Sequence, residues 1–149
     1  MSLFRHILLI TFLCGACFSA AAQSTSKRLK LQVGSDGSAR YEYREVYEYD
    51  VVWEKPEFPG GEVALMQFIN KNREYPEAAY RAGIQGRVLC SFIVNTNGTV
   101  SDVCVFRGVE ESLNREAVRI FRLMPKWVPG RMNGIAVPVR VIRPVPFRR

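Results

Sequence analysis

The chain contains few side chains that could carry out catalysis or bind a metal. Its only histidine is His6, close to the N-terminus. A serine or cysteine nucleophile depends on an imidazole that accepts and returns a proton, and most catalytic zinc sites use imidazole ligands. If His6 is removed with an N-terminal export signal, the mature chain has no histidine. These classes of enzyme and zinc site are then excluded. We therefore expect neither a metal nor a cofactor.

Acidic side chains are the remaining candidates for catalysis. Glu110 and Glu111 are adjacent, and Glu116 follows Arg115, so either pair could act as an acid and a base. Acids directly before a predicted helix more often stabilise the positive end of its dipole. We therefore expect that the protein is not an enzyme.

The first 22 residues have the order of a secretory signal peptide. Arg5 provides a short positive region, an apolar run covers residues 7–18, and three alanines end the segment at Ala22. The apolar stretch over residues 7–22 has 16 residues, fewer than the ~20 that cross a bilayer comfortably. We expect cleavage after Ala22, the alternative being an inner-membrane anchor over residues 7–22.

Charge is distributed unevenly along the chain. The formal net charge is +7, with eight acids against three bases in residues 36–62 and ten bases against three acids in residues 107–149. A basic half would favour nucleic-acid binding in a cytosolic protein, but export removes access to nucleic acid. The basic half is expected either to face acidic partner peptides or anionic envelope surfaces, or to be a solvated surface.

A length of 149 residues leaves room for one domain. Residues 23–55 form an N-terminal extension that contains no proline, and residues 56–149 form the domain. In the extension, residues 29–33 and 41–44 alternate around a glycine-containing turn at 34–37, which predicts a small β-hairpin. The polar residues 23–30 are expected to be disordered.

Two short helices are predicted at the start of the domain. Residues 62–70 place Leu65, Phe68 and Ile69 on one side at helical spacing. Pro76 suits the first residue of a second short helix. Tyr75 precedes that proline and is therefore excluded from the α region, which fixes the position of its ring.

A third helix is predicted after Ser112, which is a natural N-cap. Its apolar stripe includes residues 113, 117, 120, 121 and 124, and Pro125 ends it. Arg115, Arg119 and Arg122 share its outer face, which is either solvated or a partner-binding stripe.

Residues 87–95 and 100–106 alternate on either side of an Asn-Gly turn, the strongest short signal for a hairpin. If Thr96 faces Thr99, Phe92 opposes Val103 and Cys90 opposes Val105. Cys104 then points to the opposite face, so both thiols of the mature chain are expected to be free, with Cys90 in the core.

A third strand is predicted over residues 135–142. Val137, Val139 and Val141 lie on one of its faces. Pro138 lacks an N–H, which indicates the edge of a sheet.

Six segments at these positions resemble the C-terminal domain of TonB energy transducers. They are residues 56–61 (PEFPGG), 72–88, 92–109, 113–118, 124–130 and 133–139. The resemblance implies an α+β fold with a three-stranded antiparallel sheet and helices packed on one face. It also implies a periplasmic domain that binds the N-terminal box peptide of TonB-dependent outer-membrane receptors by strand addition, and it allows a homodimer.

The resemblance also assigns roles to individual residues. Partner-binding positions are Tyr75, Pro76, Val137, Val139, Arg140, Val141 and Ile142. Structural turns are Gly60, Gly61, Asn97, Gly98, Trp127 and Gly130.

The chain departs from a TonB transducer at its N-terminus. A transducer couples to an inner-membrane proton-driven motor complex through an uncut helix and reaches the outer membrane through a proline-rich spacer. Here the helix is a predicted signal peptide, and a spacer of about 30 residues would extend at most about 100 Å at ~3.3 Å per residue. The alternative function is therefore a soluble envelope adaptor or scaffold that binds another protein without transducing energy.

Overall fold

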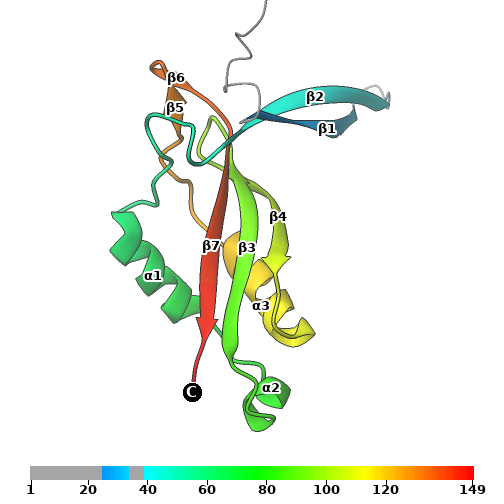
Figure 1. Cartoon of the computed structure of the whole chain (residues 1–149), viewed down its shortest axis with the longest axis vertical. Helices are drawn as coiled ribbons and strands as arrows, with labels where there is room; N and C mark the ends of the chain where they lie inside the picture. The colour runs from blue at the N-terminus through cyan, green and yellow to red at the C-terminus, as the bar shows by residue number, and fades with distance from the viewer. Residues whose placement is uncertain (1–24, 34–38) are drawn as a thin grey trace, which may run out of the picture.

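The computed structural model describes residues 25–33 and 39–149. The predicted signal peptide and the turn predicted at 34–37 lie outside these residues. The described residues form a five-stranded sheet in the order β1-β2-β7-β3-β4 and a separate two-stranded hairpin, β5-β6 (Figure 1). The strands are β1 (Thr25–Val33), β2 (Ala39–Glu48), β3 (Gly86–Val94), β4 (Val100–Arg107), β5 (Arg131–Met132), β6 (Ile135–Ala136) and β7 (Val139–Phe147), and the helices are α1 (Gly61–Asn72), α2 (Glu77–Arg81) and α3 (Glu111–Arg122).

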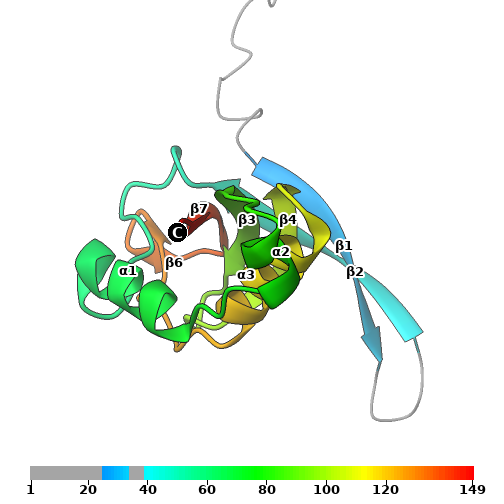
Figure 2. The same ribbon diagram turned by 90° about the horizontal axis from the view of Figure 1, so that it is seen from below.

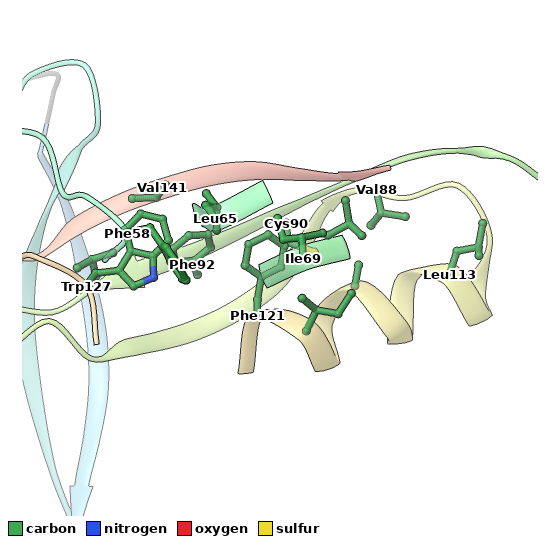
Figure 3. Close-up of a cluster of buried hydrophobic side chains, with 14 of the residues drawn as sticks. Phe58, Leu65, Ile69, Val88, Cys90, Phe92, Leu113, Phe121, Trp127 and Val141 are labelled. Carbon is green, nitrogen blue, oxygen red and sulfur yellow. The ribbon is translucent and has the colours of Figure 1, made fainter. Parts of the chain in front are cut away.

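One hydrophobic core lies between the helices and one face of the sheet. Alternate residues of β3 point into it, and the apolar stripes of α1 and α3 pack on them from the same side (Figure 3). The predicted α+β fold with helices on one face is therefore confirmed. The largest fully buried core side chains include Phe92, Phe121, Phe147, Leu65, Ile69 and Leu113.

The sheet has more strands than predicted because the N-terminal extension joins it. The predicted hairpin forms as β1 and β2, pairs along its whole length, and projects away from the helices (Figures 1 and 2). The expectation of disorder over residues 23–30 is wrong from Thr25 onward, since β1 begins there. Two residues at the end of β2 pair in parallel with β7, as Tyr47 with Val139 and Glu48 with Arg140.

The β3-β4 hairpin differs from the predicted register at its turn. Val94 pairs with Val100, so the turn lies one residue away from the predicted position. An irregularity between Ser91 and Ile93, where Asp102 has a positive φ of 53°, adds one residue on β4. The predicted pair of Phe92 with Val103 is therefore absent, whereas the predicted pair of Cys90 with Val105 is confirmed.

The N-terminus of α3 is also shifted from its prediction. The N-cap is Glu110, whose carboxylate accepts hydrogen bonds from the backbone of Ser112 and Leu113. Ser112 is instead a residue of the first turn, and its hydroxyl donates to the same carboxylate. These hydrogen bonds, led by the one from the Ser112 hydroxyl, lower the pKa of Glu110. The carboxylate charge of Glu110 is thus stabilised by its role as the N-cap of α3.

The third predicted strand is divided in two. Asn133 and Gly134, with positive φ values of 51° and 77°, close the β5-β6 hairpin, so Ile135 belongs to β6. Val137 and Pro138 lie between the strands. The long strand, β7, begins at Val139 and continues past the predicted end to Phe147, and β3 pairs with all of it.

Most of the predicted turn residues lie at positions that need their special geometry. Gly60, Gly61 and Gly98 have positive φ, and the Asn97 side chain accepts a hydrogen bond from the Thr99 backbone, 3.1 Å away. Trp127 is more than a turn residue: it is 4% exposed. Its ring lies edge-on to the rings of Phe58 and Phe92, with centroid distances of 5.6 and 5.3 Å.

A comparison of Gly98 with Gly134, both of which have positive φ, separates the free-energy cost of a left-handed backbone from the cost of steric crowding. Gly98 accepts a hydrogen bond from Trp127, and a Cβ added there would clash with the Trp127 carbonyl oxygen, whereas Gly134 has no atom within 4 Å of that position. Gly134→Ala should cost about 1–2 kcal/mol for the left-handed backbone alone. Gly98→Ala should cost roughly 1–3 kcal/mol more because of overpacking. Urea unfolding of both variants measures the difference, and equal costs would contradict the described turn.

The two described cysteines should differ in reactivity. Cys90 is buried and Cys104 is exposed on the other face, and both are free thiols. Burial raises the pKa of Cys90 to about 12, with a smaller contribution from Cys104. Since the thiolate reacts, iodoacetamide at pH 8 should alkylate Cys104 and leave Cys90 unmodified in the folded chain, while both should react in denaturant. Mass spectrometry of the peptides tests this; rapid labelling of Cys90 in the folded chain would refute its burial.

Candidate functional site

The direction of the backbone groups along β7 decides which residues a partner could reach. The Pro138 carbonyl accepts a hydrogen bond from the Tyr47 N–H at 2.9 Å, so it points away from β3. Backbone groups of successive residues point to opposite sides of a strand. Even-numbered residues of β7 therefore present their N–H and C=O groups outward, and odd-numbered residues present theirs to β3.

The prolines of β7 agree with this assignment. Pro144 and Pro146 are both even-numbered, so the side on which they lack an N–H is the outward side. The ladder with β3 therefore loses no hydrogen bond. The outward side of β7 therefore has only two N–H donors, those of Arg140 and Ile142.

The β1-β2 hairpin already occupies the start of this outward edge. Val139 and Arg140 pair with β2, and the Arg140 side chain lies 3.2 Å from Glu48 and 3.0 Å from the Ser26 hydroxyl. The expectation that Pro138 marks the edge of the sheet is therefore wrong at the start of β7, where β2 pairs with Val139 and Arg140. Val141 and Ile142 lie beyond the last pair with β2, and Ile142 keeps an outward N–H.

Beyond Arg140, arginine side chains contact two of the outward carbonyls. Arg143 donates to the Ile142 carbonyl at 3.1 Å, and Arg73 donates to the Pro146 carbonyl. The Arg143 guanidinium also lies 5.0 Å from the centre of the Tyr49 ring and 3.6 Å from Glu62. In the described part of the chain, no strand pairs with β7 on this side after Arg140.

Tyr75 and Pro76 lie at the opposite end of β7. The Tyr75 hydroxyl donates to the Ile84 carbonyl, and its ring lies edge-on to Phe147 at 5.6 Å. Eight residue steps separate Phe147 from Val139, or about 26 Å at ~3.3 Å per residue. The predicted partner-binding residues therefore lie at the two ends of one strand.

An ion pair on α3 holds the segment that precedes Tyr75. Glu116 is 8% exposed and accepts hydrogen bonds from Arg119 at 2.7 and 2.8 Å and from the Glu74 N–H at 2.8 Å. Arg119 also donates to the Asn72 carbonyl at 2.6 Å. The segment that carries Arg73 is thus fixed on both sides. Of the three arginines predicted to share one face of α3, Arg119 is a structural residue.

A groove of about 450 Å³ lies between α1 and the second half of β7. The sequence reasoning missed it because its residues come from α1, β3, β7 and the C-terminal end of the chain, and no local spacing connects them. Three of its residues are arginines and none is acidic. Its lining consists of Met66, Asn70, Arg73, Arg87, Pro144, Pro146 and Arg148.

Metal binding and membrane insertion are two further possibilities for the described residues. In residues 25–33 and 39–149, no group of three His, Cys, Asp or Glu side chains is arranged to hold a metal ion. None of the helices in the same residues combines the length and apolar character needed to cross a membrane.

Comparison with known proteins places the chain in a family. The family model described as "Gram-negative bacterial TonB protein C-terminal" matches residues 71–148, more than half of the chain. Two solution structures of the TonB C-terminal domain of Helicobacter pylori, of its residues 194–285 and 179–285, are 26% identical to this chain. They align over 58% of this chain and over 90% and 81% of their own, with TM-scores of 0.44 and 0.41. No curated protein gives a significant match. The chain belongs to the family of Gram-negative bacterial TonB protein C-terminal domains.

Proposed function

We propose that the protein is a TonB-like periplasmic protein that binds the N-terminal box peptide of TonB-dependent outer-membrane receptors and thereby supports energy-coupled transport. Family membership supports a role in receptor interaction. The observation that carries the proposal is the outer edge of β7, where Ile142 has an outward N–H beyond the last pair with β2.

The proposed recognition is strand addition, in which the box peptide pairs with this edge. Unpaired main-chain groups supply the hydrogen bonds, and alternate side chains of the peptide supply selectivity. Arg140 and Ile142 would donate, and the carbonyls of Pro138, Arg140 and Ile142 would accept. The predicted contact with Tyr75 and Pro76 would then lie at the far end of the bound segment.

Strand addition over the whole edge requires β2 to leave β7. Their contact includes two residue pairs and the ion pair of Arg140 with Glu48. The Tyr47 N–H donates to the Pro138 carbonyl, the Arg140 side chain lies within hydrogen-bond distance of the Ser26 hydroxyl, and Tyr47 packs against the core. Each hydrogen bond contributes only about 0.5–1.5 kcal/mol net, and a partly exposed ion pair adds less than about 1 kcal/mol. A receptor segment that replaces these hydrogen bonds offsets their part of the cost, and the packing of Tyr47 on the core is the remaining part. The hairpin and the receptor segment are therefore competitors for the same edge.

Ile142 provides the sharpest test of strand addition. Ile142→Pro removes the outward N–H and leaves the ladder with β3 intact, as Pro144 and Pro146 already do, whereas proline at Val139 would break that ladder. We expect the variant to bind synthetic receptor box peptides roughly tenfold more weakly, because one buried acceptor of the peptide loses its donor. Isothermal titration calorimetry measures the affinity.

Ile142→Val is the matched control, since it keeps both the N–H and a β-branched side chain, and it should bind like the unmodified chain. Thermal unfolding of both variants checks that β7 stays formed. Equal binding by the proline variant would show that pairing does not use this edge. No binding of any box peptide by the unmodified chain would favour the envelope scaffold.

The N-terminus decides between a tethered transducer and an accessory protein. We expect the leader to be cleaved, so that protein recovered from the cell envelope begins at Gln23 and acts as an accessory without its own membrane helix. Intact-mass spectrometry of the exported protein measures this directly. An uncut chain in the inner-membrane fraction would instead support an anchored transducer that reaches a proton-driven motor complex.

A further inference from the structure

We propose that the groove beside the second half of β7 binds an acidic side chain of the same receptor segment, about four residues beyond the residue that pairs with Ile142. This inference rests on the proposed function and adds the chemistry of the partner. The groove continues the edge of β7, since Pro144 and Pro146 line it. Four residue steps at ~3.3 Å bring an extended partner about 13 Å along the edge, from Ile142 to Pro146.

Main-chain recognition is one-sided along the groove. Pro144 and Pro146 have no N–H, so β7 offers only carbonyl acceptors there, and Arg73 already donates to that of Pro146. A partner that continues along the edge meets side-chain donors instead of a ladder of backbone donors. It must therefore bring acceptors of its own.

The donors in the groove are three guanidinium groups. They come from Arg73 before α2, Arg87 on β3 and Arg148 near the C-terminus. Within the described ranges, none of the three forms an ion pair with an acidic side chain, and no acid lines the groove. The positive charge in this groove is therefore not compensated by the residues around it.

A carboxylate is the ligand that these donors fit. The planar guanidinium binds a carboxylate through two parallel hydrogen bonds, and hydrogen bonds between charged groups are roughly twice as strong as neutral ones. Met66, Pro144 and Pro146 add apolar surface beside the arginines, which reduces solvent screening. Arg73 is held in place by its bond to Pro146 and by the contacts of Glu116 and Arg119 with its neighbours.

The experiment uses the chain from Gln23 to Arg149 and synthetic receptor box peptides of about ten residues. In one series a single Asp moves along the parts of the peptide on both sides of the strand-added residues, and in the matched series Asn replaces it. We expect Asp to bind about tenfold more tightly than Asn at one position, as expected for a hydrogen-bonded charge pair. The preference should weaken as salt rises.

The variant R87Q/R148Q should abolish the preference for Asp while the Asn peptide binds as before. Arg73 is left unchanged because it also holds the end of β7. The control is R107Q, which removes one arginine of β4 outside the groove and should keep the preference.

Each outcome bears on one claim. If no peptide binds, the proposed function fails. If peptides bind but Asp and Asn are equal at every position, or if R87Q/R148Q keeps the preference, the acidic contact is refuted and strand addition stands. Anionic phosphatidylglycerol vesicles form a separate arm. Vesicle binding that is lost in R87Q/R148Q, together with equal binding of Asp and Asn peptides, would reassign the groove to lipid headgroups and overturn the inference.

Discussion

The alternation of backbone direction along β7 is the constraint on which the rest of the account depends. Odd-numbered residues form the ladder with β3 and place Val139, Val141 and Val145 in the core. Even-numbered residues leave their polar groups on the outward side, and two of them inside the strand are prolines. β7 is therefore integral to the fold on the side that faces β3. On its outward side it has only two N–H donors. The start of the outward side carries the β1-β2 hairpin and its second half borders the arginine-lined groove.

Features set by local sequence could be predicted, and those that depend on distant segments could not. The stripe of α3 follows from helical periodicity over twelve residues, and the Asn-Gly turn identifies the β3-β4 hairpin. The exact register of that hairpin depends on a bulge at Asp102, and the alternation of apolar residues along the two strands does not indicate this bulge. The parallel contact of Tyr47 with Val139 joins segments 92 positions apart (139 − 47). No local pattern specifies such a contact.

The candidate site shows the same division. Tyr75 could be singled out because the following proline fixes its backbone, and the structure places its ring against Phe147 at the end of β7. The convergence of Arg73, Arg87 and Arg148 could not be predicted, since three separate segments bring them together. The uneven charge of the chain left an acidic partner, an anionic surface and a solvated surface open, and of the groove arginines only Arg148 belongs to the basic stretch 107–149.

Amide hydrogen exchange at Ile142, followed by NMR, distinguishes an outer edge of β7 that receives a peptide strand from one that does not. Strand addition predicts that the Ile142 N–H exchanges quickly in the free chain and becomes protected when a receptor box peptide is added. The neighbouring Val141 N–H, which faces β3, should be protected in both states. An Ile142 N–H that is already protected in the free chain, or that stays unprotected in a saturated peptide complex, would contradict the account.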